Sequence, residues 1–102
     1  MTIHLKKQSL DSVVMFLSGR FDINSALRLE QKIKPFLDGT FDITLDLKNL
    51  DCISNSGLYV LLHAYKTMNL NKRKLVIRNM GDPVRDVFEM TGFIALVGEE
   101  KV

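Results

Sequence analysis

The sequence predicts an α/β fold, a single domain with a mostly parallel sheet of four to five strands and helices mainly on one face. Apolar residues alternate along residues 41–47, as in a strand with one face on the core. They recur every third or fourth residue along 58–68, as in a helix. Such segments alternate along most of the chain, which favours crossovers between parallel strands. The expected order is β-β-α-β-α-β-α, with a candidate final strand.

The first two strands are expected to form a hairpin. Residues 3–7 alternate like a strand, and residues 9–12 suit a tight turn. Residues 13–17 are apolar on both faces, which is typical of a central strand.

A first helix is expected after residues 19–24, which break the strand pattern. Asn24 is the predicted N-cap, because its side chain can accept a free backbone N–H of the first turn. The apolar residues that follow have helical spacing: Ala26, Leu29, Ile33, Phe36 and Leu37. Pro35 lacks a backbone donor and predicts a kink or an early end, and Asp38-Gly39 closes the segment.

A polar turn separates the third strand from the second helix. It consists of Ser54, Asn55, Ser56 and Gly57, and we expect one of the first three to cap the helix. The buried stripe of that helix is predicted to contain Leu58, Leu61, Leu62, Tyr65 and Met68. The opposite face carries Tyr59, Val60, His63 and Thr67. These apolar residues fit either scattered surface positions or a patch that binds a partner.

The last third of the chain is predicted to hold a strand at 75–77 and a third helix. Asp82 is the expected cap, with Pro83 at the first helical position. The inward residues are expected to be Val84, Val87, Phe88 and either Met90 or Thr91. Gly92 ends the helix, residues 93–97 are the candidate edge strand, and residues 98–102 are expected to fray.

Composition is typical of one globular domain spanning residues 1–102. The chain is 46% hydrophobic and 25% charged, and its net charge of +2 is too small to indicate a nucleic-acid partner. The single cysteine, Cys52, permits no internal disulfide and is expected to be buried and inert. No signal peptide or membrane-spanning run is recognised, so we expect a cytoplasmic protein without membrane insertion.

No catalytic or metal-binding pattern is present in the sequence. His4 and His63 lie in different elements and have no zinc-ligand spacing, and phosphate loops and nucleophile elbows are missing. Ser54 and Ser56 have no evident base to activate them. We therefore expect neither an enzyme nor a cofactor, a metal or an obligatory small-molecule ligand.

Three segments together resemble the STAS domains of the anti-sigma factor antagonist family. They are Gly19-Arg20-Phe21-Asp22, the stretch from Leu45-Asp46-Leu47 through Ile53-Ser54-Asn55-Ser56-Gly57-Leu58, and Met90-Thr91-Gly92-Phe93. The resemblance covers nearly the whole chain. It differs at the C-terminus, where many members add a further helix and this chain is too short for a full one.

The resemblance implies a binding protein rather than an enzyme. Simple members bind an anti-sigma factor that is also a serine kinase, which releases the sigma factor for transcription. The kinase switches such antagonists off by phosphorylating the first serine of a D-S-S-G turn. Here Ser54 matches the aspartate, Asn55 the phosphorylated serine and Ser56 the second serine, with Gly57 retained. Because Asn55 has no hydroxyl, we expect an antagonist that is not switched at this position. Ser54 and Ser56 fit helix caps better than phosphate acceptors, and both roles remain open from the sequence.

The expected partner-binding residues are the turn Ser54 to Gly57, the helix face at Tyr59, Val60 and His63, and Asp22, which equally fits a turn former. Two other functions remain open. STAS domains also serve as subunits of lipid-transport ATPases or of signalling assemblies, and a small-molecule or nucleotide-binding domain is the third hypothesis.

Overall fold

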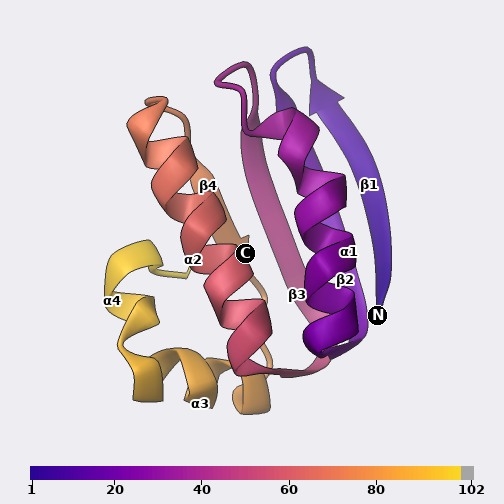
Figure 1. Cartoon of the computed structure of the whole chain (residues 1–102), viewed down its shortest axis with the longest axis vertical. Helices are drawn as coiled ribbons and strands as arrows, with labels where there is room; N and C mark the ends of the chain where they lie inside the picture. The colour runs from indigo at the N-terminus through magenta and orange to yellow at the C-terminus, as the bar shows by residue number, and fades with distance from the viewer. Residues whose placement is uncertain (100–102) are drawn as a thin grey trace.

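The structure is a computed structural model that describes residues 1–99, and it consists of one sheet and the helices that pack on it (Figure 1). The elements in chain order are β1 (Thr2–Ser9), β2 (Ser12–Phe21), α1 (Ile23–Ile33), the 3₁₀ helix η1 (Lys34–Phe36), β3 (Asp42–Ile53), α2 (Asn55–Leu70), β4 (Leu75–Arg78), α3 (Asp82–Thr91) and α4 (Phe93–Val97).

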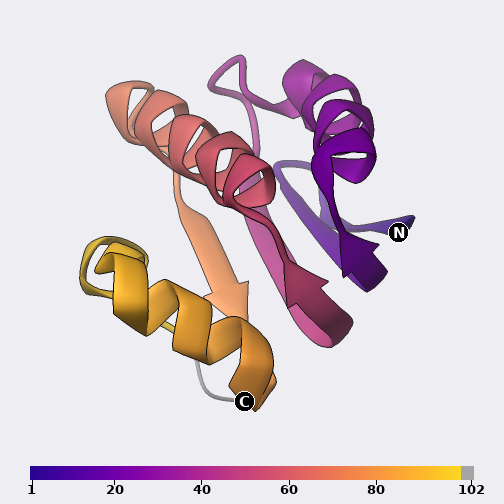
Figure 2. The ribbon, with the colours of Figure 1, turned by 60° about the horizontal axis from the view of Figure 1, so that its bottom comes forward.

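The sheet has four strands in the order β1-β2-β3-β4, and it confirms the predicted mostly parallel arrangement. The β1–β2 pair is the expected antiparallel hairpin, whereas β3 pairs in parallel with both β2 and β4. In Figure 2, α1 and α2 lie side by side over one face of the sheet, and α3 and α4 lie on the β4 side. Helices therefore cover mainly one face, as predicted.

The core lies between that face and the helices. Alternate residues of the two central strands are buried there: Val13, Met15 and Leu17 of β2, and Ile43, Leu45 and Leu47 of β3. The helices contribute Leu29, Leu61, Met68, Val84 and Phe88, each with an exposed fraction of 0%. Burying each such side chain stabilises the fold by about 1.5–3 kcal/mol.

The open face of the sheet carries a buried carboxylate, Asp46. Its side chain accepts hydrogen bonds from the Lys48 backbone N–H, the Arg78 guanidinium and the Asn79 amide, each at 3.0 Å. Burial acts to raise the pKa of Asp46, but these donors outweigh it and the pKa lies below the usual value. Asp46 thus links the backbone of β3 at Lys48 to the end of β4.

The third strand is longer than the sequence pattern predicted, and Cys52 is not buried. Strand β3 continues to Ile53 because register shifts opposite β2 keep it paired beyond the alternating segment 41–47. Ile53 faces the core, so its neighbour Cys52 points away from it and is exposed.

Two of the predicted helix caps are wrong. Helix α1 begins two residues earlier than expected, with Asp22 rather than Asn24 as N-cap, whereas Pro35 does end it early by forming η1. Gly81 rather than Asp82 is the N-cap of α3, which places Asp82 inside the first turn. For α1, strand β2 ends at Phe21, so Asp22 is the first residue available to cap the helix.

The inward face of α3 also differs from prediction at its end. Val84 and Phe88 are buried and Val87 is half-buried, but Met90 is 86% exposed and Thr91 is exposed too. The Thr91 hydroxyl lies 2.9 Å from the Val87 carbonyl oxygen, within its own helix.

The candidate edge strand at residues 93–97 is a helix, α4. Gly92 adopts a left-handed conformation with φ of 76°, which turns the chain at the end of α3. Phe93 then stacks on Phe88 with ring centroids 5.1 Å apart, and the Tyr65 hydroxyl donates to the Leu96 carbonyl oxygen at 3.0 Å. These contacts hold α4 against α2 and α3, away from strand pairing.

The start of the predicted frayed tail is anchored. The Glu99 carboxylate accepts a hydrogen bond from the Met80 backbone N–H at 2.8 Å and pairs with the Arg85 guanidinium at 2.8 Å. Glu99 therefore ties the chain to the loop between β4 and α3, which corrects the prediction at this residue. Residues 100–102 lie outside the described residues.

Candidate functional site

The two long helices start next to each other at one end of the sheet. In the parallel β2–β3 pair, Phe21 stands opposite Ile53. The backbone N–H of Ser54 donates to the Phe21 carbonyl oxygen at 2.8 Å, which holds the two strand ends together. Asp22 and Ser54, 32 positions apart in the sequence, therefore precede the first turns of α1 and α2 at the same edge (Figure 1).

Ser54 is the N-cap of α2. Its hydroxyl oxygen accepts the Gly57 backbone N–H at 3.2 Å, and its carbonyl oxygen accepts the Leu58 N–H at 3.0 Å. This confirms that one residue of the turn caps the helix. Asn55 and Ser56 are the first two residues of α2 rather than a separate turn, and Asn55 is exposed.

Gly57 is required by packing rather than by backbone conformation. A Cβ atom at this position would lie 2.6 Å from Cδ1 and 2.8 Å from Cε1 of the Phe21 ring, and 3.0 Å from Cγ1 of Ile53. Phe21 is fully buried, so its ring has little room to move. The glycine lets the first turn of α2 lie directly on the ends of β2 and β3.

Asp22 caps α1 in the same way that Ser54 caps α2. Its carboxylate oxygen Oδ1 accepts the Ser25 backbone N–H at 2.9 Å and lies 3.0 Å from the Ser25 hydroxyl. These hydrogen bonds, the backbone one foremost, hold the pKa of Asp22 below its usual value. Of its two predicted roles, the structure shows the local structural one.

Exposed apolar side chains extend from both helix starts. Tyr59 is 72% exposed and His63 is exposed, whereas Val60 is half-buried and packs against the core. Sequence reasoning missed Ile23 and Leu27 of α1, which are 64% and 61% exposed. The signal was available, because this apolar pair at i and i+4 falls outside the buried stripe of α1.

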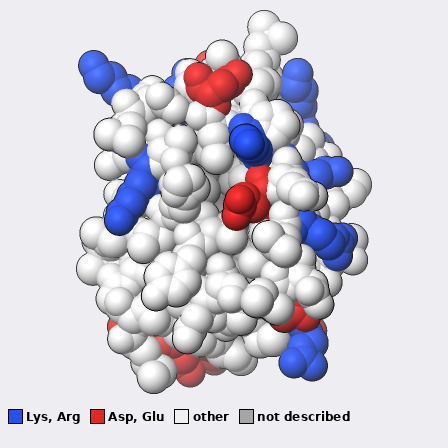
Figure 3. Space-filling model, viewed as in Figure 1, with Lys and Arg blue, Asp and Glu red and all other residues white. Residues whose placement is uncertain are grey.

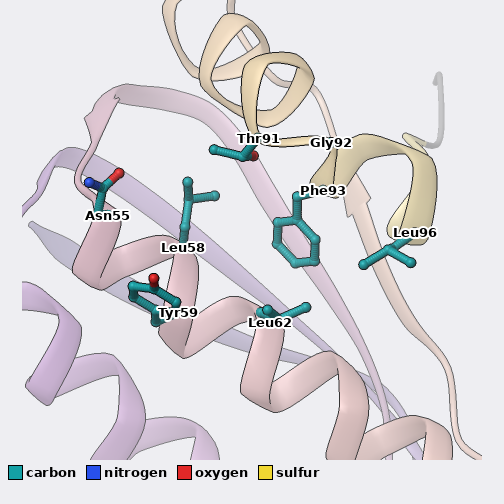
Figure 4. A pocket seen from close by; sticks show the side chains of 8 residues that line it. All are labelled: Asn55, Leu58, Tyr59, Leu62, Thr91, Gly92, Phe93 and Leu96. Carbon is teal, nitrogen blue, oxygen red and sulfur yellow. The ribbon is translucent and has the colours of Figure 1, made fainter.

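A hollow of about 340 Å³ lies between α2 and the junction of α3 with α4 (Figure 4). Its lining residues are Asn55, Leu58, Tyr59, Leu62, Thr91, Gly92, Phe93 and Leu96. The late segment 90–93 is thus brought to the first turns of α2, next to Asn55. Sequence reasoning did not place this segment at the site.

The described residues offer no group of three or more His, Cys, Asp or Glu side chains that could hold a metal ion. Within residues 1–99, no helix is both long and apolar enough to cross a membrane. The chemistry at the helix starts is that of capping groups, amides, hydroxyls and apolar side chains, which suits binding of another protein.

Comparison with known proteins gives concordant matches. A family model described as "Mlab, STAS domain" matches residues 4–98. The anti-sigma-B factor antagonist of Staphylococcus aureus is 31% identical over 77 residues, which cover 74% of this chain and 71% of that protein. BtrV of Bordetella bronchiseptica, whose assignment as an anti-sigma factor antagonist is provisional, is 33% identical over 85 residues, covering 82% and 73%.

A solved structure shows the same fold. The unphosphorylated form of the anti-sigma factor antagonist SpoIIAA superposes with a TM-score of 0.85 at 19% identity, covering 97% of this chain and 88% of that one. The four-stranded sheet and the helices over it are therefore a known arrangement.

Proposed function

Since this chain belongs to the STAS domain family, we propose that it is an anti-sigma factor antagonist. It binds an anti-sigma factor and thereby frees a sigma factor for transcription. The observation that supports this most is the convergence of three segments, 19–22, 54–57 and 90–93, around the first turns of α2. Proteins of similar sequence carry this name, and the site contains binding groups rather than a catalytic set.

The proposed partner is a serine-kinase-like anti-sigma factor in the cytoplasm. The proposed contact surface comprises Asp22, the segment Ser54 to Gly57, and Tyr59, Val60 and His63, to which the structure adds Ile23 and Leu27. Exposed aromatic and aliphatic side chains beside polar helix ends are common in protein interfaces. Tyr59 is the strongest candidate anchor because it is the largest exposed side chain of the surface.

We further propose that the partner does not switch this antagonist by phosphorylation at residue 55. Asn55 has no hydroxyl to accept a phosphoryl group. The hydroxyl of Ser54 is already used as a helix cap, so its modification would disturb the start of α2. Ser56 is the remaining hydroxyl of the segment, and we expect it to stay unmodified.

A pull-down from the native cytoplasm, with this chain as bait, tests the proposal. Mass spectrometry of the captured proteins should identify a kinase-like anti-sigma factor, and the bait should carry no phosphate on Ser54 or Ser56. Recovery of transporter ATPase subunits would instead support the second hypothesis, a STAS subunit of a lipid-transport complex, and would overturn the antagonist role.

The variant Asn55→Ser tests the missing switch directly. Its unphosphorylated form should bind the captured anti-sigma factor as the parent does, because the exposed first position of α2 tolerates either side chain. With ATP and the kinase it should acquire phosphate and lose binding without unfolding, since a helix N-terminus accommodates a phosphate. A parent chain that is phosphorylated equally well on another residue of the segment would contradict the proposal.

A further inference from the structure

The outer edge of β1 is a long strand edge without a partner. Strand β1 is the first strand of the sheet and has eight residues, and within residues 1–99 no other strand pairs with its outer side. Every second N–H and C=O along such an edge is free to form hydrogen bonds. At the opposite edge, β4 has only four residues and contacts α4.

Basic side chains surround the β1 edge. Lys6 and Lys7 lie on the strand, and Arg28 and Lys32 are exposed on the neighbouring helix α1. Arg28 and Lys32 line a hollow of about 340 Å³ together with Ile3 and Gln31, so the basic groups of α1 face the strand edge. In the space-filling view, Lys and Arg side chains lie along the side of the molecule that α1 and β1 form (Figure 3).

Within residues 1–99, Lys6, Lys7, Arg28 and Lys32 form no ion pair with a carboxylate. The ion pairs found there involve Arg73, Arg78 and Arg85, and one of them joins Arg73 to Asp11 in the turn that follows β1. A net charge of +2 on the whole chain thus conceals a locally basic edge. A second copy of β1 would bring like charges opposite each other, which opposes self-pairing.

We propose that the β1 edge binds an extended acidic segment of a partner protein, which adds to the sheet as a fifth strand. Main-chain hydrogen bonds to β1 would supply the pairing, as in other cases of strand addition. Carboxylates on the helix-facing side of the added segment would lie beside Arg28 and Lys32 and supply the selectivity. This inference is independent of the role in sigma-factor release.

A peptide of alternating Glu and Thr, as long as β1 and blocked at both ends, is the probe. The matched control peptide has Lys in place of Glu. Binding is followed by fluorescence anisotropy, and hydrogen exchange locates it on the intact chain. The acidic peptide should bind and slow the exchange of alternate β1 amides, those not already bonded to β2, and binding should weaken as salt is raised.

Charge reversal separates this site from general attraction to a basic protein. Arg28→Glu combined with Lys32→Glu should weaken binding of the acidic peptide by about tenfold or more. Lys66→Glu combined with Lys72→Glu changes the net charge equally at exposed positions outside the edge, and should leave binding within about twofold.

Three outcomes would overturn the proposal: no binding of the acidic peptide, equal binding of the Lys peptide, or equal weakening by the two double variants.

Discussion

Helices α1 and α2 begin at the same edge of the sheet and match position by position, yet they begin differently. The caps are Asp22 and Ser54, the third helical residues are Ser25 and Gly57, and the fifth are the exposed Leu27 and Tyr59. In each helix the cap accepts the N–H of the third residue. Helix α1 thus has a charged cap, whereas α2 has a neutral cap and a glycine that lets its first turn lie against Phe21 and Ile53. The comparison shows that close packing on the ends of the strands distinguishes the start of α2.

Gly57→Ala should have the largest effect, because the added Cβ would meet the buried Phe21 ring. Overpacking of this kind costs about 1–3 kcal/mol of unfolding free energy. The matched variant Ser25→Ala removes only a hydroxyl and should cost about 1 kcal/mol. Urea unfolding measures both. A double variant with Phe21→Leu should recover part of the Gly57→Ala loss, and equal losses at the two helices would contradict the packing account.

Tyr59→Ala should weaken binding of the anti-sigma factor by about tenfold, or about 1.4 kcal/mol, as expected for an exposed aromatic anchor. Leu27→Ala, its counterpart in α1, tells whether the partner contacts both helices. Leu70→Ala, at the far end of α2 and also strongly exposed, is the control that should bind normally. Calorimetry with the purified partner provides the affinities. If Leu27→Ala alone weakens binding, α1 is the main contact helix.

Ser54→Ala should destabilise the fold by about 1 kcal/mol, because the Gly57 N–H loses its acceptor. Ser54→Asp should retain stability, since a carboxylate is an equally good cap and is favoured at a helix start. Thermal unfolding compares the two variants, and a Ser54→Ala variant as stable as its parent would show that water replaces the cap.

Asp22→Asn should produce the smallest effect, and one that depends on pH. Because the pKa of Asp22 lies below its usual value, the ionised carboxylate stabilises the folded state. This contribution is fully present above the unfolded pKa of about 4 and is lost as pH falls through the lower folded pKa. The stability difference between parent and Asp22→Asn should therefore shrink on acidification. Glu30→Gln, on an exposed residue of the same helix, is the control.

The fold could be predicted wherever the pattern that specifies it is local. Alternation at residues 41–47 and helical spacing at 58–68 each arise because one face of the element packs against the core. The strand and the helix that they predict are both present. Residues 93–97 are too few to show a period, and contacts with Tyr65 and Phe88 decide their helical state. Asp22 and Asn24 are both residue types that favour an N-cap. Asp22 takes this role because strand β2 ends directly before it.

The candidate site was predicted in part for a similar reason. The segment Ser54 to Gly57 is local in sequence and could be proposed as a candidate from it, together with Tyr59. Asp22 lies near the start of α2 because Phe21 pairs with Ile53 in the sheet. Thr91 and Gly92 lie near the first turns of α2 because of the way α3 packs. Such placement arises from pairing between distant segments, which one sequence does not display.

The contact of Glu99 has a consequence for synthesis of the chain. During translation, β4 and α3 leave the ribosome before residue 99 does. Until then the Met80 N–H lacks its acceptor, and Arg85 has only Asp82 as an ion-pair partner. The loop between β4 and α3 can therefore reach its final hydrogen bonding only after residue 99 has emerged, later than the loop itself and the helix that follows it.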